Sequence, residues 1–120
     1  MSAVTTRQPR WVYDAGDEPD PRFSLANERT FLAWVRTALA MFAGGVALHA
    51  LGVPSTDWVR TLVVIALIGL GGLFCVFALV RWARIERAMR LREPLPSFGL
   101  GLVMTTTLAL VALLLVVVLI

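Results

Sequence analysis

The sequence predicts an all-α integral membrane protein with three transmembrane helices. The chain has 120 residues, of which 58% are hydrophobic, and a mean hydropathy of +0.80. This is too apolar for a soluble domain of that size. Three stretches with almost no charged residue are each long enough to cross a hydrocarbon core of about 30 Å. The arginines gather before the first stretch and after the second, as expected for one side of a membrane.

The first twenty residues predict a disordered, acidic N-terminal tail. No apolar run of the length that a signal peptide requires occurs in residues 1–20. Residues 14–20 combine acidic side chains with glycine and proline, which disfavours regular structure. We therefore divide the chain into a tail, residues 1–20, and a three-span membrane domain, residues 21–120.

The first span is expected at about residues 31–50, after a helical lead-in over residues 22–30. Asp20, Pro21 and Ser24 provide the chemistry of a helix start. No charged residue occurs between Thr37 and Thr56. Arg36 therefore lies about a turn or two inside an apolar helix, where an unpaired charge costs on the order of 3 kcal/mol.

Arginines recur every seven residues at the start of this span, at positions 22, 29 and 36. On a helix, residues seven apart lie about 20° from each other and about 10 Å apart along the axis. Small residues continue the same stripe: Ala33, Ala40, Ala43 and Ala47. Membrane helices bury such small faces against protein, so the stripe predicts a partner.

Glu28 is offset by about 80° from Arg36 around the helix, so the two cannot pair within one helix. Arg81 and Arg84 emerge at the same membrane level, directly after the second span. We predict a structural ion pair between Glu28 and the end of the second helix, within or between subunits.

The second span is expected at about residues 59–80, with a cytosolic helical extension over residues 81–92. The prolines at positions 94 and 96 end the helix, and the third span follows at about residues 98–120, with no charge after Glu93. The arginines of the extension have two interpretations, contact with anionic lipid headgroups or a polyanion site. Because the arginines lie before the first span and after the second, we expect a cytosolic N-terminus and a C-terminus outside.

Residues 25–37, Leu-Ala-Asn-Glu-Arg-Thr-Phe-Leu-Ala-Trp-Val-Arg-Thr, are followed by Ala-Gly-Gly-Val-Ala at residues 43–47. This motif closely resembles the YidH-type family (domain-of-unknown-function family 202), bacterial three-helix inner-membrane proteins. Its Asn-Glu-Arg-Thr-Phe-Leu-x-Trp core is also similar to the membrane domain of the vacuolar transporter chaperone complex, a eukaryotic polyphosphate polymerase. The resemblance covers about residues 20–120 and implies a multi-pass protein of the bacterial inner (plasma) membrane. The chain has no polymerase domain, so any polymer would come from elsewhere.

The sequence shows no nucleophile–base pair, metal-ligand set or phosphate loop, so we expect no enzyme activity, cofactor, metal or nucleic-acid partner. The leading hypothesis is a homo-oligomer in the lipid bilayer with an arginine-lined site or path for an anion, phosphate or polyphosphate by the resemblance. The alternative is a non-conducting scaffold or assembly subunit, with structural arginine–carboxylate pairs that include Glu28. The anion site or pore lining would use Arg22, Arg29, Arg36, Arg81 and Arg84.

Overall fold

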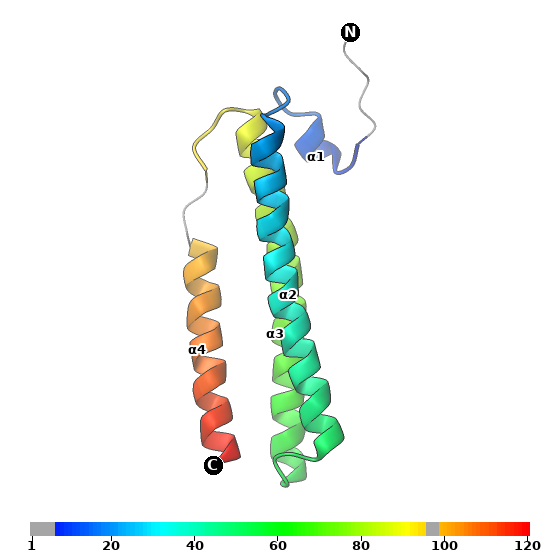
Figure 1. The fold of residues 1–120 in the computed structure, drawn as a ribbon, viewed down its shortest axis with the longest axis vertical. Coiled ribbons are helices and arrows are strands. Elements are labelled where there is room, and N and C mark those ends of the chain that lie inside the picture. Colours follow the sequence, from blue (N-terminus) through cyan, green and yellow to red (C-terminus); the bar gives the residue numbers. More distant parts are fainter. Residues whose placement is uncertain (1–6, 96–98) are drawn as a thin grey trace.

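The structure is a computed structural model that describes residues 7–95 and 99–120. All secondary structure in these residues is helical: α1 (Arg10–Tyr13), α2 (Pro21–Leu51), α3 (Asp57–Arg90) and α4 (Gly99–Leu119). Helices α2 and α3 lie side by side as an antiparallel hairpin, and α4 stands beside them (Figure 1). Three helices are long and apolar enough to cross a membrane, so the predicted fold class is confirmed.

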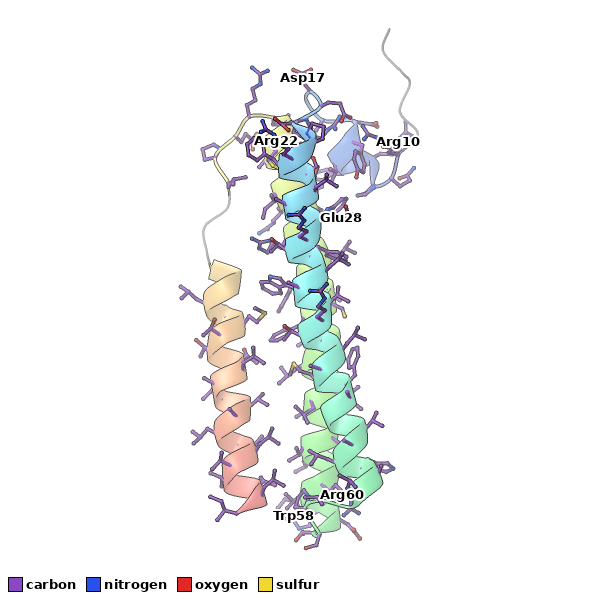
Figure 2. The ribbon with its side chains drawn as sticks, viewed as in Figure 1. Arg10, Asp17, Arg22, Glu28, Trp58 and Arg60 are labelled. Carbon is purple, nitrogen blue, oxygen red and sulfur yellow. The ribbon has the colours of Figure 1, made fainter. Side chains whose placement is uncertain are left out.

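The three long helices differ in length, and the difference indicates which part of the hairpin lies within the hydrocarbon core. At 1.5 Å per residue, α2, α3 and α4 are about 46, 51 and 31 Å long. Only α4 matches a hydrocarbon core of about 30 Å. Helices α2 and α3 extend past the start of α4 at the end where α1 lies (Figure 1). This is the charged end, with Arg10, Arg22 and Glu28, whereas Trp58 and Arg60 mark the opposite end (Figure 2).

Helices α2 and α3 pack closely because small residues lie at their crossing. The buried core between them comprises Ala38, Met41, Val63, Leu67 and Phe74. A Cβ atom on Gly71 would lie 2.6 Å from the Phe42 ring and 3.1 Å from the Ala38 carbonyl oxygen, whereas one on Gly72 would meet nothing within 4 Å. Gly71 therefore sets the distance between the two helices.

A short turn joins α2 to α3. Gly52 ends α2 with a φ of +66°, a left-handed conformation that glycine adopts without a Cβ penalty. The Arg60 guanidinium donates hydrogen bonds to the Pro54 carbonyl (2.9 Å) and to the Asp57 carboxylate (2.6 Å). These contacts hold the first turn of α3 against the loop and close the hairpin.

Helix α4 contacts the hairpin through one apolar row, and most of its other described side chains are exposed. The row consists of Met104, Leu108, Val111, Leu115 and Val118. An apolar groove of about 410 Å³ runs beside the row, and its α2 wall includes Thr37, Ala40, Gly44 and Ala47. The third predicted span, residues 98–120, corresponds to α4, apart from residue 98, which is outside the described residues.

The N-terminal segment differs from the disordered tail that composition predicts. Residues 1–6 are outside the described residues, but residues 7–20 contain α1 and lie against the end of α3 (Figure 1). The reason is tertiary, because the arginines of α3 bind backbone carbonyls of this segment. In the membrane domain, α2 includes the lead-in and the predicted span 31–50. Helix α3 includes the predicted span 59–80 and most of the extension 81–92, and it ends at Arg90.

Candidate functional site at the charged end of the helices

Arg90 is buried, with 5% of its surface exposed, and it anchors the N-terminal segment to α3. Its guanidinium donates three hydrogen bonds: to the Ala15 carbonyl (2.8 Å), the Tyr13 carbonyl (2.8 Å) and the Glu18 carboxylate (3.0 Å). The Asp17 N–H returns a bond to the Arg90 carbonyl (3.0 Å). Both the side chain and the backbone of one residue therefore hold the segment.

Gly16 allows the segment to come this close. Its φ is +49°, and a Cβ atom built on it would lie 1.9 Å from the Arg90 carbonyl oxygen. No side chain fits there, since real Cβ contacts stay well beyond that distance. Aromatic contacts complete the interface: the Tyr13 and Trp82 rings are 6.2 Å apart, and the Arg87 guanidinium lies 4.7 Å from the Trp11 ring centre.

Three carboxylates of the segment pair with arginines: Asp14, Glu18 and Asp20. Hydrogen bonds from Arg7 and then from Arg90 lower the pKa of Glu18 below its ordinary value. The hydrogen bonds from Arg22 likewise lower the pKa of Asp20, which also accepts the Arg22 backbone N–H at the start of α2. Neighbouring arginines therefore fix most of the negative charge of the segment, and the Asp17 side chain has no ion pair among the described residues.

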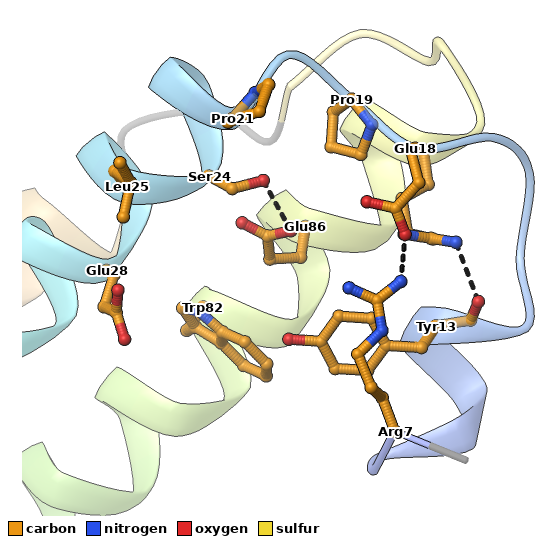
Figure 3. Close-up of a pocket in the computed structure, with 11 residues that line it drawn as sticks. Arg7, Tyr13, Glu18, Pro19, Pro21, Ser24, Leu25, Glu28, Trp82 and Glu86 are labelled. Atoms are coloured by element: carbon orange, nitrogen blue, oxygen red, sulfur yellow. Dashed lines mark hydrogen bonds and ion pairs between the residues drawn. The ribbon is translucent and has the colours of Figure 1, made fainter. Parts of the chain in front are cut away.

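Glu86 is a buried carboxylate between α2 and α3, and only 3% of its surface is exposed. Ser24 Oγ donates to it at 3.2 Å (Figure 3). Asn27 Nδ2 donates to it at 3.4 Å. Asn27 Nδ2 also donates to the Trp82 carbonyl at 3.0 Å, so the amide is oriented by two acceptors. Asn27 Oδ1 is then left buried without a donor among the described residues, at a cost of about 1–3 kcal/mol.

A pocket of about 290 Å³ opens beside Glu86, between the N-terminal segment and the two long helices (Figure 3). Its walls combine three carboxylates, two guanidinium groups, the Tyr13 and Trp82 rings and two prolines. In the described part of the chain, no group of three His, Cys, Asp or Glu side chains is placed to hold a metal ion. The lining residues are Arg7, Tyr13, Glu18, Pro19, Pro21, Ser24, Leu25, Glu28, Trp82, Glu86 and Arg90.

The predicted arginine stripe lies on the exposed side of α2. Arg29 and Arg36 are both exposed, and within residues 7–95 and 99–120 neither has a hydrogen bond or ion pair. Their small neighbours Ala33, Ala40, Ala43 and Ala47 are exposed as well. Arg22 differs, because Asp20 pairs with it at 2.8 Å. Among the described residues, no side chain covers Arg29 or Arg36, whereas Ala40 and Ala47 also line the groove toward α4.

The other three residues predicted for the site, Arg81, Arg84 and Glu28, form no hydrogen bond or ion pair with one another among the described residues. The Arg81 guanidinium lies 6.0 Å from the Trp34 ring centre, on the side of α3 that faces α2. Arg84 is exposed and lines a hollow with Trp11 instead. Glu28 is exposed at the pocket rim and makes no ion pair within the described residues. A pair between Glu28 and α3 within the chain is therefore absent there, and a pair between subunits stays a prediction.

Sequence reasoning missed the buried polar group of Ser24, Asn27 and Glu86, and the role of Arg90. The spacing of Glu86 and Arg90 indicates a pair one helical turn apart, but their side chains bind α2 and the N-terminal segment respectively. Asn27 directly precedes Glu28, and Glu86 directly precedes Arg87, so each stands beside a charged residue. The local sequence therefore gave no signal that the two side chains are buried or that they share an interface.

Comparison with known proteins identifies the family. The model of the domain of unknown function DUF202 matches residues 22–88, which is more than half of the chain. The chain belongs to the DUF202 family. The matched region runs from the start of α2 to near the end of α3, so it includes the arginine stripe and the Ser24–Asn27–Glu86 group of this DUF202 protein.

Two bacterial proteins are similar in sequence to this DUF202 chain. It is 46% identical over 98 residues to the inner membrane protein YidH of Escherichia coli K12, covering 81% of this chain and 85% of that protein. It is 49% identical over 81 residues to the uncharacterized protein MT2333 of Mycobacterium tuberculosis CDC 1551, covering 66% of each. No solved structure matches. Together with its three spanning helices, this makes the DUF202 chain a multi-pass inner-membrane protein.

Proposed function

We propose that this protein self-associates in the membrane through the exposed face of α2, and that Arg29 and Arg36 then line a site or path for an anion. The observation that carries the proposal is that both guanidinium groups are exposed and unpaired in the described chain. Facing lipid, an arginine at the depth of Arg36 costs on the order of 3 kcal/mol. A hydrated space shared by several copies removes that cost.

The depth of Arg36 follows from its neighbour. Thr37 lines the groove between α2 and α4, so Arg36 lies level with α4, the helix that matches the membrane thickness. The exposed Ala43 below it allows a helix of a neighbouring copy to approach closely, and Ala40 and Ala47, which also line the groove toward α4, leave room for water or for a second helix. Rings of arginine in a low-dielectric wall attract anions and exclude cations.

Phosphate or polyphosphate is the proposed class of anion. A guanidinium can hold two phosphate oxygens at once, which an ammonium cannot. The first-helix motif supports the same class through its resemblance to the membrane domain of the vacuolar transporter chaperone complex. In this proposal the N-terminus and the charged end face the cytosol, where phosphate compounds are supplied.

The test measures binding and flux of inorganic phosphate and short polyphosphate with purified protein in liposomes. We expect Arg36→Lys to weaken binding although it retains the charge, and Arg36→Ala to weaken it further while the oligomer stays assembled. Arg10→Ala, which removes an exposed arginine from α1, is the matched control and should leave binding unchanged. Absence of any anion response in the unmodified protein would refute the proposal.

A second candidate is a non-conducting scaffold subunit, and the exposed, unpaired Glu28 favours it. In that case Glu28 of one copy neutralises Arg29 or Arg36 of the next. Glu28→Gln and Arg36→Ala should then both dissociate the oligomer, as measured by light scattering of the detergent-extracted protein. An oligomer that survives both changes rules out the scaffold pairing.

A further inference from the structure

Two hollows meet on the outer side of α3, beside the N-terminal segment. One has an apolar lining and the other has a charged lining. One holds about 610 Å³ and has an almost wholly apolar wall that includes Pro9, Leu79, Val80 and Ala83. The other holds about 280 Å³ and is lined by Arg87, Ala88, Glu93 and Pro94. Trp11 and Arg84 line both. The two hollows therefore form one groove with an apolar half and a charged half.

The groove is placed at the edge of the hydrocarbon layer. Leu79 and Val80 are exposed and are the last residues of the uncharged run of α3, and the arginines begin with Arg81. Arg84 and Arg87 follow within the next two turns. Trp11, which is 55% exposed, lies where the apolar half meets the charged half. Indole side chains favour this boundary between tails and headgroups.

The charged half carries an excess of positive charge. Arg84 is exposed and has no ion pair or hydrogen bond in the described residues. The Arg87 Nε donates to the Trp11 carbonyl at 3.2 Å, which leaves its two terminal nitrogens available. Glu93 supplies the one carboxylate of the lining, so two guanidinium groups face one negative charge. This arrangement suits a phosphate diester, which both arginines can approach.

We propose that this groove binds an anionic phospholipid, with the headgroup phosphate on Arg84 and Arg87 and an acyl chain along Leu79, Val80 and Ala83. Charge complementarity and the match of the apolar half to the end of the hydrophobic run argue for a lipid as occupant. Because Trp11 belongs to the segment that Arg90 anchors, the lipid contacts α3 and the N-terminal segment together. Lipid binding and docking of the segment are therefore linked, and each stabilises the other.

The experiment is native mass spectrometry of the delipidated, full-length protein in detergent, titrated with phosphatidylglycerol or phosphatidylcholine. We expect one phosphatidylglycerol per chain, bound at least about tenfold more tightly than phosphatidylcholine. Arg84→Gln should weaken phosphatidylglycerol binding about fivefold or more, and Trp11→Ala should weaken it for both lipids. Arg92→Gln removes an exposed arginine outside the groove and is the matched control, with less than about a twofold effect.

Four results would overturn the proposal. Equal affinity for the two lipids would show that the arginines do not select the headgroup. An equal loss in Arg84→Gln and Arg92→Gln would show diffuse attraction to a basic surface. Glycerol 3-phosphate competing as tightly as the intact lipid would show a site for free phosphate, with no acyl chain in the apolar half. A groove occupied by a second copy of the chain would appear as dimers that lose phosphatidylglycerol binding, which also contradicts the proposal.

Discussion

Replacing Arg90 by alanine should release residues 7–20 from the end of α3. Arg90 donates to two backbone carbonyls and to Glu18, and it is buried. A hydrogen bond from a charged donor contributes about 1.5–3 kcal/mol. We take the lower figure for each carbonyl, because water can replace the donor once the segment opens. The Glu18 side chain is 63% exposed, and a pair so exposed adds little.

The expected loss is then about 3 kcal/mol, or about 150-fold in the equilibrium between the docked and the open segment. Hydrogen exchange followed by mass spectrometry measures this opening. The Asp17 amide is the reporter, since its acceptor is the Arg90 carbonyl. Arg90→Lys should give an intermediate result, because a single ammonium cannot serve three acceptors with the geometry of a guanidinium.

Arg29→Ala is the matched control, since it removes an exposed arginine that has no partner in the described residues. Its exchange pattern in residues 11–20 should equal that of the unmodified protein. If Arg90→Ala leaves the protection of these residues unchanged, or if Arg29→Ala lowers it equally, the anchoring role of Arg90 is refuted.

Three further predictions concern packing, pH and orientation. Gly71→Ala should destabilise the hairpin by about 1–3 kcal/mol, because the added Cβ would meet the Phe42 ring and the Ala38 carbonyl. Thermal denaturation in detergent measures this loss. Gly72→Ala is the control and should leave the stability nearly unchanged, because its Cβ would meet no atom within 4 Å. Since the pKa of Glu18 is lowered in the folded state, its contribution is complete above the ordinary value of 4.5 and is lost as the pH falls through the lower folded pKa. The protection factors of residues 11–20, which are the exchange rates corrected for the intrinsic pH dependence of amide exchange, should therefore fall only in acid and stay constant between pH 6 and 8. A reporter fused after Ile120 should be active outside the cytosol, and cytosolic activity would contradict the proposed orientation.

Hydropathy alone predicted the three spanning helices, because the bilayer leaves few alternatives for a long apolar run. The charges at the ends are also visible in the sequence, as the arginines at 29, 36, 81 and 84 show. Helical periodicity places Arg29 and Arg36 on one face, and the structure leaves that face exposed. What covers it depends on other molecules, which the sequence of one chain does not describe.

The docking of residues 7–20 was beyond sequence reasoning for a physical reason. Arg90 binds the carbonyls of Tyr13 and Ala15, and every residue type has a carbonyl. The composition of the segment, acidic and rich in glycine and proline, predicted disorder. In fact Gly16 is needed at a φ of +49° so that the chain can turn against Arg90. A segment of this composition can therefore form an ordered, docked loop when a buried arginine donates hydrogen bonds to its backbone carbonyls.

The single row by which α4 meets the hairpin has a consequence for biogenesis. Lipid tails are as apolar as the side chains of that row, so the bilayer exerts little force that drives α4 onto its neighbours. Helices α2 and α3, in contrast, are joined by a five-residue turn and share a close-packed interface. The hairpin can thus form as soon as α3 is inserted, and α4 joins it later by lateral diffusion within the membrane. Changes in the α4 row should affect this second event and leave insertion of the hairpin intact.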